Sequence, residues 1–246
     1  MTGSALFVFF GTAHLAAIAL TFIVPLVLAV ITRAVGGRQA VRFMRYLFAA
    51  ELIATWILWY WLIWERGWIS WQTTLPMHLC DWATITALIT LLWPNQRTYE
   101  LAYFWSLSGT VQALLTPELF YDFPDLRFIV FFAFHGGVIA AVLYLTAGAR
   151  MRPYPSSIPR VLLWSLVYLA AAGTVDWLLH VNYGFLAAKP AAASLLDFLG
   201  PWPWYIASLA GAGIVYVLLL YSPFFVADQV RGRPPQPIGR WGNHGA

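Results

Sequence analysis

Charge is what this sequence has least of. Only 10% of its 246 residues are Asp, Glu, Lys or Arg, whereas 61% are hydrophobic and 17% are aromatic. A soluble globular domain carries roughly 25% charged residues, so the composition excludes an ordinary soluble protein and predicts a polytopic membrane protein. The chain also holds a single cysteine, Cys80, which excludes an intrachain disulfide framework.

Two further absences narrow the class of membrane protein. The first ten residues contain no Lys or Arg, so the basic n-region of a cleaved signal peptide is missing. No internal repeat stands out, which gives no support to an inverted-repeat transporter. The formal net charge is +4, but the basic residues are spread along loop positions. They indicate positive-inside bias rather than nucleic-acid binding, and we predict no nucleic-acid partner.

Seven apolar runs separated by short polar loops predict a single all-α domain, a polytopic transmembrane bundle of seven helices over residues 1–246. Each helix needs about 20 residues to cross a bilayer. The expected spans are about 5–31, a second run ending near 64, 75–93, 98–115, 128–147, 161–180 and 206–221. Counted by alternate sides, 11 basic residues fall on one side and three on the other. This places the N-terminus outside and the C-terminus in the cytoplasm, with a short disordered tail at about 229–246.

The stretch 75–81, Leu-Pro-Met-His-Leu-Cys-Asp, concentrates ionisable side chains at the start of the third span. Such groups are costly in hydrocarbon and suggest a functional site. Pro76 suits the first turn of a helix, so we expect Cys80 about one turn inside. His78 and Asp81, three apart, share a helical face, whereas His78 and Cys80 do not. The base for Cys80 is therefore expected from another span.

Polar residues of five spans agree in depth, in the expected outer half of the bundle. They are His14, Cys80, Gln112, His135, Asp176 and His180, and together they predict an outward-facing polar cavity. Asp176, His180 and Tyr183, at spacings of four and three, predict one helical stripe in which a carboxylate orients an imidazole. Glu51 falls toward the inner side, where we expect it to pair with Arg45.

Each of these residues also has a structural interpretation. A lone cysteine in a membrane helix usually packs as a small hydrophobe. His135, followed by two glycines, could be a packed histidine with a backbone hydrogen bond. Asp176 and His180 could anchor the headgroup region. His14 is open between a ligand, a proton relay and a packing role.

The arrangement of these motifs resembles the bacterial YwaF family, which groups with the eukaryotic transmembrane protein 164 family. The resemblance covers nearly the whole chain. It lies in 75–81, in the span from Gln112 to Pro117, in Phe-Phe-Ala-Phe-His at 131–135, in Asn182-Tyr183 followed by Lys189-Pro190, and in Pro-Trp-Pro-Trp-Tyr at 201–205. It implies a lipid acyltransferase with Cys80 and His135 as catalytic residues. It also implies an integral protein of the bacterial inner membrane.

The chemistry expected from this resemblance needs few parts. His135, within about 3 Å of Cys80, would take the thiol proton, and the thiolate would attack an acyl ester to give a thioester. A lysophospholipid hydroxyl would collect the acyl group, or water would in a hydrolase. Candidate oxyanion donors are Gln112 and Asn182, and Asp81 or Asp176 could orient an imidazole. The remaining supporting or substrate-binding candidates are His14, His78, His180 and Tyr183.

The expected partners are therefore phospholipid and lysophospholipid, and we predict neither a cofactor nor a bound metal. Two other functions remain open from the residues alone. The His, Cys and Asp side chains could form a path in a transporter or channel for a metal ion, proton or small solute, since His and Cys are good ligands. Alternatively, the cavity could hold a lipid without chemistry, as in a sensor.

Overall fold

The computed structural model describes residues 5–72, 74–190 and 194–232, and in these ranges the chain is a bundle of helices. Its elements are α1 (Thr12–Val35), α2 (Arg38–Glu65), α3 (Leu79–Leu92), α4 (Gln96–Trp105), the π-helix η1 (Ser106–Thr110), α5 (Val111–Leu115), α6 (Leu126–Ala147), α7 (Ser157–Leu179), the 3-10 helices η2 (Tyr183–Phe185) and η3 (Leu195–Leu199), and α8 (Trp204–Arg231). The all-α prediction is confirmed.

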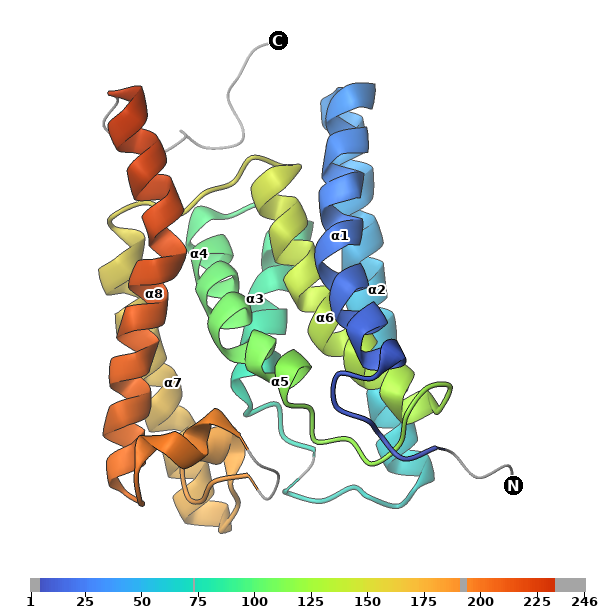
Figure 1. The fold of residues 1–246 in the computed structure, drawn as a ribbon, viewed down its shortest axis with the longest axis vertical. Coiled ribbons are helices and arrows are strands. Elements are labelled where there is room, and N and C mark those ends of the chain that lie inside the picture. The colour runs from blue at the N-terminus through green and yellow to red at the C-terminus, as the bar shows by residue number, and fades with distance from the viewer. Residues whose placement is uncertain (1–4, 73, 191–193, 233–246) are drawn as a thin grey trace.

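Figure 1 shows how the long helices are arranged, running up and down along the long axis of the molecule. Helices α1 and α2 lie on one side, α7 and α8 on the other, and α3, α4 and α6 between them. The most apolar window of α6 is 67% buried, against 11% for α8. Helix α6 is therefore the central element of the core, whereas α8 is peripheral.

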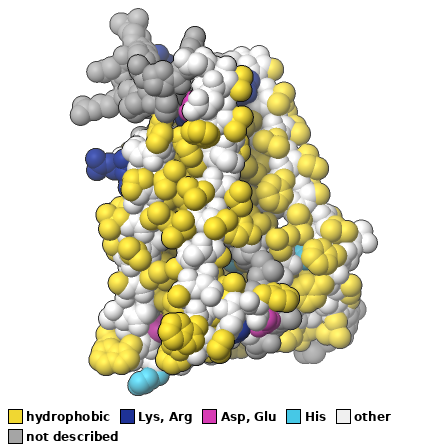
Figure 2. Space-filling model, turned by 60° about the vertical axis from the view of Figure 1, so that its left-hand side comes forward, with side chains coloured by type: hydrophobic (Ala, Val, Ile, Leu, Met, Phe, Trp, Pro, Cys, Tyr) yellow, Lys and Arg dark blue, Asp and Glu magenta, His cyan; other side chains and the backbone are white. Residues whose placement is uncertain are grey.

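Membrane insertion is supported by the lengths and surfaces of the helices. Five of them, α1, α2, α6, α7 and α8, are long and apolar enough to cross a bilayer. Helix α3 has 14 residues, or about 21 Å at 1.5 Å per residue, which is less than the hydrocarbon thickness of about 30 Å. Hydrophobic side chains cover much of the face shown in Figure 2. The count of seven spans and their orientation stay predictions.

The first and fourth predicted spans differ from the observed helices. Helix α1 begins at Thr12 rather than near residue 5, because residues 5–7 lie extended against the loop before α6. There the Phe7 amide donates to Phe120 O (3.1 Å) and the Asp122 amide to Ala5 O (2.9 Å). The fourth span is a helix interrupted by η1, a π-helical segment of the kind that often accompanies function.

Helix α8 continues beyond the predicted end near Tyr221, through Pro223 to Arg231. A proline inside a helix leaves the carbonyl four residues earlier without its donor. Here that carbonyl is Leu219 O, and the Ser222 hydroxyl donates to it at 2.8 Å. The side chain thus replaces the missing backbone donor, which lets the helix pass through the proline. Residues 233–246 of the predicted tail lie outside the described residues.

The basic residues of several loops gather at one end of the bundle, which we call the basic end. It comprises the α1–α2, α3–α4 and α6–α7 connections and the end of α8 (Figure 1). The end opposite to it carries the segment between α2 and α3, the segment before α6, and η2 and η3. The sequence stretch 75–81 belongs to this opposite end.

Candidate functional site

The candidate site is built on the start of α3. Leu79 is the first residue of that helix, and His78 caps it in an extended conformation. Cys80 is therefore the second helical residue, not one turn inside as expected, because Pro76 precedes the helix instead of occupying its first turn. The carboxylate of Asp81 accepts a hydrogen bond from the His78 amide at 2.9 Å. His78 and Asp81 do interact, but through the backbone in a capping arrangement.

Two tyrosines from the α7 side hold this segment in place. The Tyr183 hydroxyl donates to Trp71 O and accepts from the Leu75 amide at 3.1 Å. The Tyr168 hydroxyl donates to Met77 O at 3.2 Å. Tyr183 is 1% exposed, and this burial raises its pKa, so the hydroxyl keeps its donor proton. Tyr168 was missed by sequence reasoning, since nothing in its apolar surroundings marks it.

His78 lies against η2, the short helix that follows α7. Its ring centroid is 5.0 Å from that of Tyr183 and 6.2 Å from that of Phe185. The Gly184 amide donates to His78 Nδ1 at 3.4 Å. Gly184 has a φ of 62°, and a Cβ there would lie 2.5 Å from the Tyr168 hydroxyl. This close approach of backbone to the site therefore requires glycine.

The Cys80 side chain is half-buried and forms no disulfide. The neighbouring amide of Asp81 donates to His78 O at 3.0 Å, which closes the first turn of α3. Tyr168 lies within electrostatic range of Cys80, Asp81 and Asp176. The polar groups around Cys80 thus come from α3 itself and from α7.

His135 approaches the same region from the central helix α6. Its Nδ1 lies 2.9 Å from Phe131 O, and because a carbonyl can only accept, Nδ1 must carry the proton. The other ring nitrogen, Nε2, is then the basic one, and it has no hydrogen-bond partner among the described residues. His135 is half-buried and within electrostatic range of His78. No hydrogen bond joins His135 to Cys80 within the described ranges.

Glu51 does not pair with Arg45, which corrects the sequence expectation. The Arg45 guanidinium instead donates to the last carbonyls of α3, to Leu91 O at 2.8 and 2.5 Å and to Leu92 O at 3.1 Å. Glu51 packs against α6, where a Cβ on Gly137 would lie 2.5 Å from its Oε2. That oxygen is buried without a hydrogen-bond partner in the described part of the chain. Glu51 thus stands next to the α6 segment that carries His135.

His14 is a structural link rather than a member of this cluster. Its Nδ1 accepts from the Phe10 amide at 2.9 Å, and its Nε2 donates to Leu114 O at 2.7 Å. The side chain is 0% exposed and is surrounded by aromatic rings, including Phe7 and Phe132. Both ring nitrogens are used, so His14 ties the start of α1 to α5.

The predicted helical stripe of Asp176, His180 and Tyr183 does not form. Helix α7 ends at Leu179, and His180 takes a left-handed conformation with φ 52°, which turns the chain away from the helical path. Asp176 Oδ1 accepts from the Tyr183 amide at 2.7 Å and so fixes η2 rather than an imidazole. The His180 side chain is exposed on the surface of the bundle.

The two side-chain amides proposed as oxyanion donors are engaged elsewhere. Asn182 Oδ1 accepts from the amides of Ala187 and Ala188 at 3.0 Å each, and its Nδ2 donates to Ala188 O at 2.9 Å. Gln112 Nε2 donates to the Tyr216 hydroxyl of α8 at 3.1 Å, leaving its buried Oε1 without a partner in the described ranges. Asn182 therefore shapes the loop after α7, and Gln112 contacts the peripheral helix.

Metal binding was the alternative use of these His, Cys and Asp side chains. Within the described ranges, no three His, Cys, Asp or Glu side chains come close enough together to hold an ion. The polar residues of the site are instead spread over α2, α3, α6, α7 and η2.

Comparison with known proteins gives one match. Neither a curated protein nor a solved structure is significantly similar to the chain. Residues 9–221, from just before α1 into α8, match the TMEM164 family, in agreement with the transmembrane protein 164 part of the resemblance. The match includes every candidate site residue discussed above. This protein belongs to the TMEM164 family.

Proposed function

We propose that this protein is a membrane-embedded lipid acyltransferase that carries a fatty acyl group on Cys80 and uses His135 as general base. The observation that carries the proposal is the hydrogen bond from His135 Nδ1 to Phe131 O, which leaves Nε2 basic and unpartnered in the described chain. Family membership and the half-buried thiol of Cys80 support the same assignment.

In the first half-reaction, Nε2 of His135 takes the thiol proton and the sulfur attacks the carbonyl carbon of a phospholipid ester. The bond from that carbon to the glycerol oxygen breaks, and the leaving oxygen receives the proton from the imidazolium. The products are the Cys80 thioester and a lysophospholipid. A thiolate formed here would lie in the first turn of α3, where the positive end of the helix dipole favours negative charge.

In the second half-reaction, the hydroxyl of an acceptor lysophospholipid gives its proton to His135 and attacks the thioester. The carbon–sulfur bond breaks and the proton returns to the thiolate, so a new ester forms and the enzyme is regenerated. Water in place of the lysophospholipid would make the reaction a hydrolysis. The backbone amide of Cys80, in the first turn of α3, donates to the oxyanion in place of Gln112 and Asn182, the donors expected from the sequence.

The test is the intact mass of protein purified from lipid-rich membranes, compared among the native chain, Cys80→Ala and His135→Ala. We expect a fatty-acyl adduct that maps to Cys80, is released by hydroxylamine and disappears in both variants. His180→Ala, a change at an exposed histidine, should keep the adduct. An adduct that survives loss of His135 would indicate static acylation and contradict the proposed mechanism.

A proton path is the second candidate function, and Glu51 favours it. Its Oε2 is buried without a partner in the described chain and lies against α6 at Gly137, so polar groups reach further into the bundle than the sequence suggested. Buried carboxylates in membrane helices often serve proton relays. Protein in liposomes containing a pH-sensitive dye tests this: proton flux that Glu51→Gln abolishes, with no acyl adduct on Cys80, would replace the acyltransferase proposal.

A further inference from the structure

His78 and His135 carry their protons on different ring nitrogens. The amide of Gly184 lies 3.4 Å from His78 Nδ1, and because an amide N–H can only donate, Nδ1 must offer a lone pair. The proton of the neutral ring is then on Nε2, which has no hydrogen-bond partner in the described part of the chain. His78 therefore presents an unpartnered donor, whereas His135, protonated on Nδ1, presents an unpartnered acceptor.

The His78 ring is held in place by the short helix η2. Its centroid lies 5.0 Å from that of the Tyr183 ring, and the two ring planes meet at 69°. Asp176 fixes η2 in turn, because its Oδ1 accepts from the Tyr183 amide at 2.7 Å. Donors that are oriented before the reaction stabilise developing charge without a cost of reorganisation. The Nε2–H of His78 is such a donor.

This donor lies close to Cys80. His78 precedes α3 in an extended conformation, with ψ 153°, so the helical geometry that separates residues two apart does not apply to it. Its Cα lies two residues from that of Cys80, or at most about 7 Å away. The Tyr168 hydroxyl lies against the Gly184 backbone and within electrostatic range of Cys80, and His78 is within electrostatic range of His135. The two histidines and the cysteine therefore belong to one site.

The proposed reaction needs a donor of this kind. Attack of the thiolate places negative charge on the carbonyl oxygen of the ester, for which the amide of Cys80 is one donor. The next two amides of the first turn, those of Asp81 and Trp82, already donate to His78 O at 3.0 and 3.4 Å. Oxyanion sites of acyl transfer combine backbone amides with side-chain donors, histidine among them. The Nε2–H of His78 can supply the second donor.

We propose that His78 is a catalytic residue whose Nε2–H donates to the carbonyl oxygen of the acyl ester, beside the amide of Cys80. This inference rests on the proposed function and gives the two histidines different roles, because His135 transfers protons and His78 stabilises negative charge. The hydrogen bond breaks no covalent bond, and the Nε2 proton stays on His78. The thiol proton still passes to His135 and from there to the leaving oxygen.

The experiment replaces His78 by the two amide side chains, each of which keeps one function of the ring. The Oδ1 of Asn accepts from the Gly184 amide as Nδ1 does but leaves no donor at the position of Nε2, whereas Gln extends its amide to that position. Protein freed of acyl groups with hydroxylamine is mixed with dioleoyl phosphatidylcholine in detergent micelles, and the Cys80 adduct is followed over time by intact mass. His78→Asn should lower the acylation rate about 100-fold or more, as the loss of an oxyanion donor does, and His78→Gln should stay within about tenfold of native.

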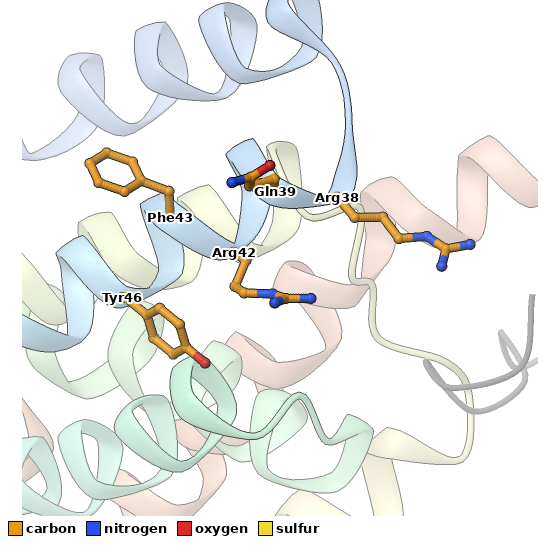
Figure 3. Close-up of a pocket in the computed structure, with 5 residues that line it drawn as sticks. All are labelled: Arg38, Gln39, Arg42, Phe43 and Tyr46. Carbon is orange, nitrogen blue, oxygen red and sulfur yellow. The ribbon is translucent and has the colours of Figure 1, made fainter.

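Two control variants lie away from this site. His180→Asn makes the same substitution at an exposed histidine. Gln39→Ala removes an exposed amide at the basic end, where Gln39 lines a hollow at the start of α2 with Arg38, Arg42, Phe43 and Tyr46 (Figure 3). Both variants should be acylated within about twofold of the native rate, as is usual for exposed positions. A loss in either control equal to that of His78→Asn would contradict a specific role of His78.

The order of the two His78 variants separates catalysis from packing. If His78 only holds η2 through Gly184, His78→Asn should keep the native rate and His78→Gln should lose it, which would overturn the proposal. His78→Gln also provides the reading if His78→Asn does not fold, since a loss of about 100-fold in the Gln variant would contradict the donor role. A native protein that forms no adduct on Cys80 would overturn the proposed function as well, whereas native-like acylation of His78→Asn would overturn the role of His78 alone.

Discussion

The two ends of the bundle differ in how completely their polar side chains are paired with one another. At the basic end, Arg152 makes a bidentate ion pair with Asp228 at 2.7 and 2.5 Å, which raises the pKa of Arg152. Buried Glu100 is held by Arg160 and, at 2.9 Å, by Gln96. At the opposite end, Arg127 pairs with Asp125, but the one hydrogen bond of the His135 ring in the described chain is through Nδ1. One carboxylate oxygen of Asp176 and, toward the middle, one of Glu51 are buried without a partner in the described chain.

We therefore distinguish polar side chains that are paired with one another from those that lack a partner. Paired groups hold α4, α7, α8 and the α6–α7 loop together and have little capacity left for a ligand. Unpaired polar groups in a membrane bundle cost stability, so under the proposed function we interpret these groups as available to a substrate. The predictions below alter one group from each category and compare the results.

The largest effect is expected from His135→Ala. Removing a general base typically lowers a rate by about 100- to 10,000-fold, and we expect acyl transfer between a labelled phospholipid and a lysophospholipid in vesicles to fall accordingly. Thermal stability should change little, because the ring donates only one hydrogen bond, to Phe131 O. His180→Ala, at an exposed position, should retain the native rate. An equal loss of rate in the two variants would contradict a specific role of His135 as the general base.

Breaking the ion pair at the basic end should act on stability instead. Arg160→Ala leaves Glu100, which is 1% exposed, without its counter-ion. We expect a loss of about 2 kcal/mol in unfolding free energy, less than for a fully buried pair because Arg160 is partly exposed. Thermal unfolding in detergent measures it. Glu100→Gln combined with Arg160→Ala should recover part of the loss, and Arg97→Ala, at an exposed arginine, is the control.

His14→Phe tests whether the buried histidine is structural. The substitution removes two hydrogen bonds and leaves the Phe10 amide and Leu114 O unpaired, which should cost about 2 kcal/mol. The acyl adduct on Cys80 should persist wherever the protein is folded. A stable His14→Phe protein that has lost the adduct would instead place His14 in the reaction.

The smallest effect is expected from Asn182→Ala. Loss of its turn hydrogen bonds in a half-exposed loop should cost about 1 kcal/mol and change the transfer rate less than threefold, as is usual for groups outside the reaction. Loss of an oxyanion donor would lower the rate by about 100- to 1,000-fold. Transfer assays on this variant therefore decide between a loop residue and a catalytic one.

The fold and the site were predictable from the sequence to different degrees. Apolar runs predicted the helical order, because hydrophobicity and length act locally. Helix ends were less predictable: α3 starts at Leu79 because His78 and Asp81 cap it, and α8 passes Pro223 because Ser222 supplies a donor. Both depend on side-chain geometry that periodicity does not encode.

Among the site residues, Cys80 and His135 were singled out by their chemistry within apolar helices, and that remains the basis of the proposal. Tyr168 and Gly184 were missed, because an aromatic and a glycine in such a composition carry no signal by themselves. The stripe of Asp176, His180 and Tyr183 was predicted from spacing along a continuous helix, and it does not form because α7 ends at Leu179. Gln112 and Asn182 were proposed as oxyanion donors from the expected chemistry, but Gln112 bonds to Tyr216 and Asn182 to the loop after α7.

The sequence by itself determined that this chain is a helical membrane protein, that its few ionisable groups are concentrated at helix ends and in a few spans, and which family it belongs to. Only the tertiary structure decided which histidine has a free nitrogen. In the sequence, His14 and His135 both lie within apolar runs, and nothing in those runs distinguishes them. The second ring nitrogen of His14 donates to Leu114 O, which lies 100 residues away in the chain. The His135 ring bonds only within its own helix. A partner as distant as Leu114 is brought to His14 by the packing of the helices.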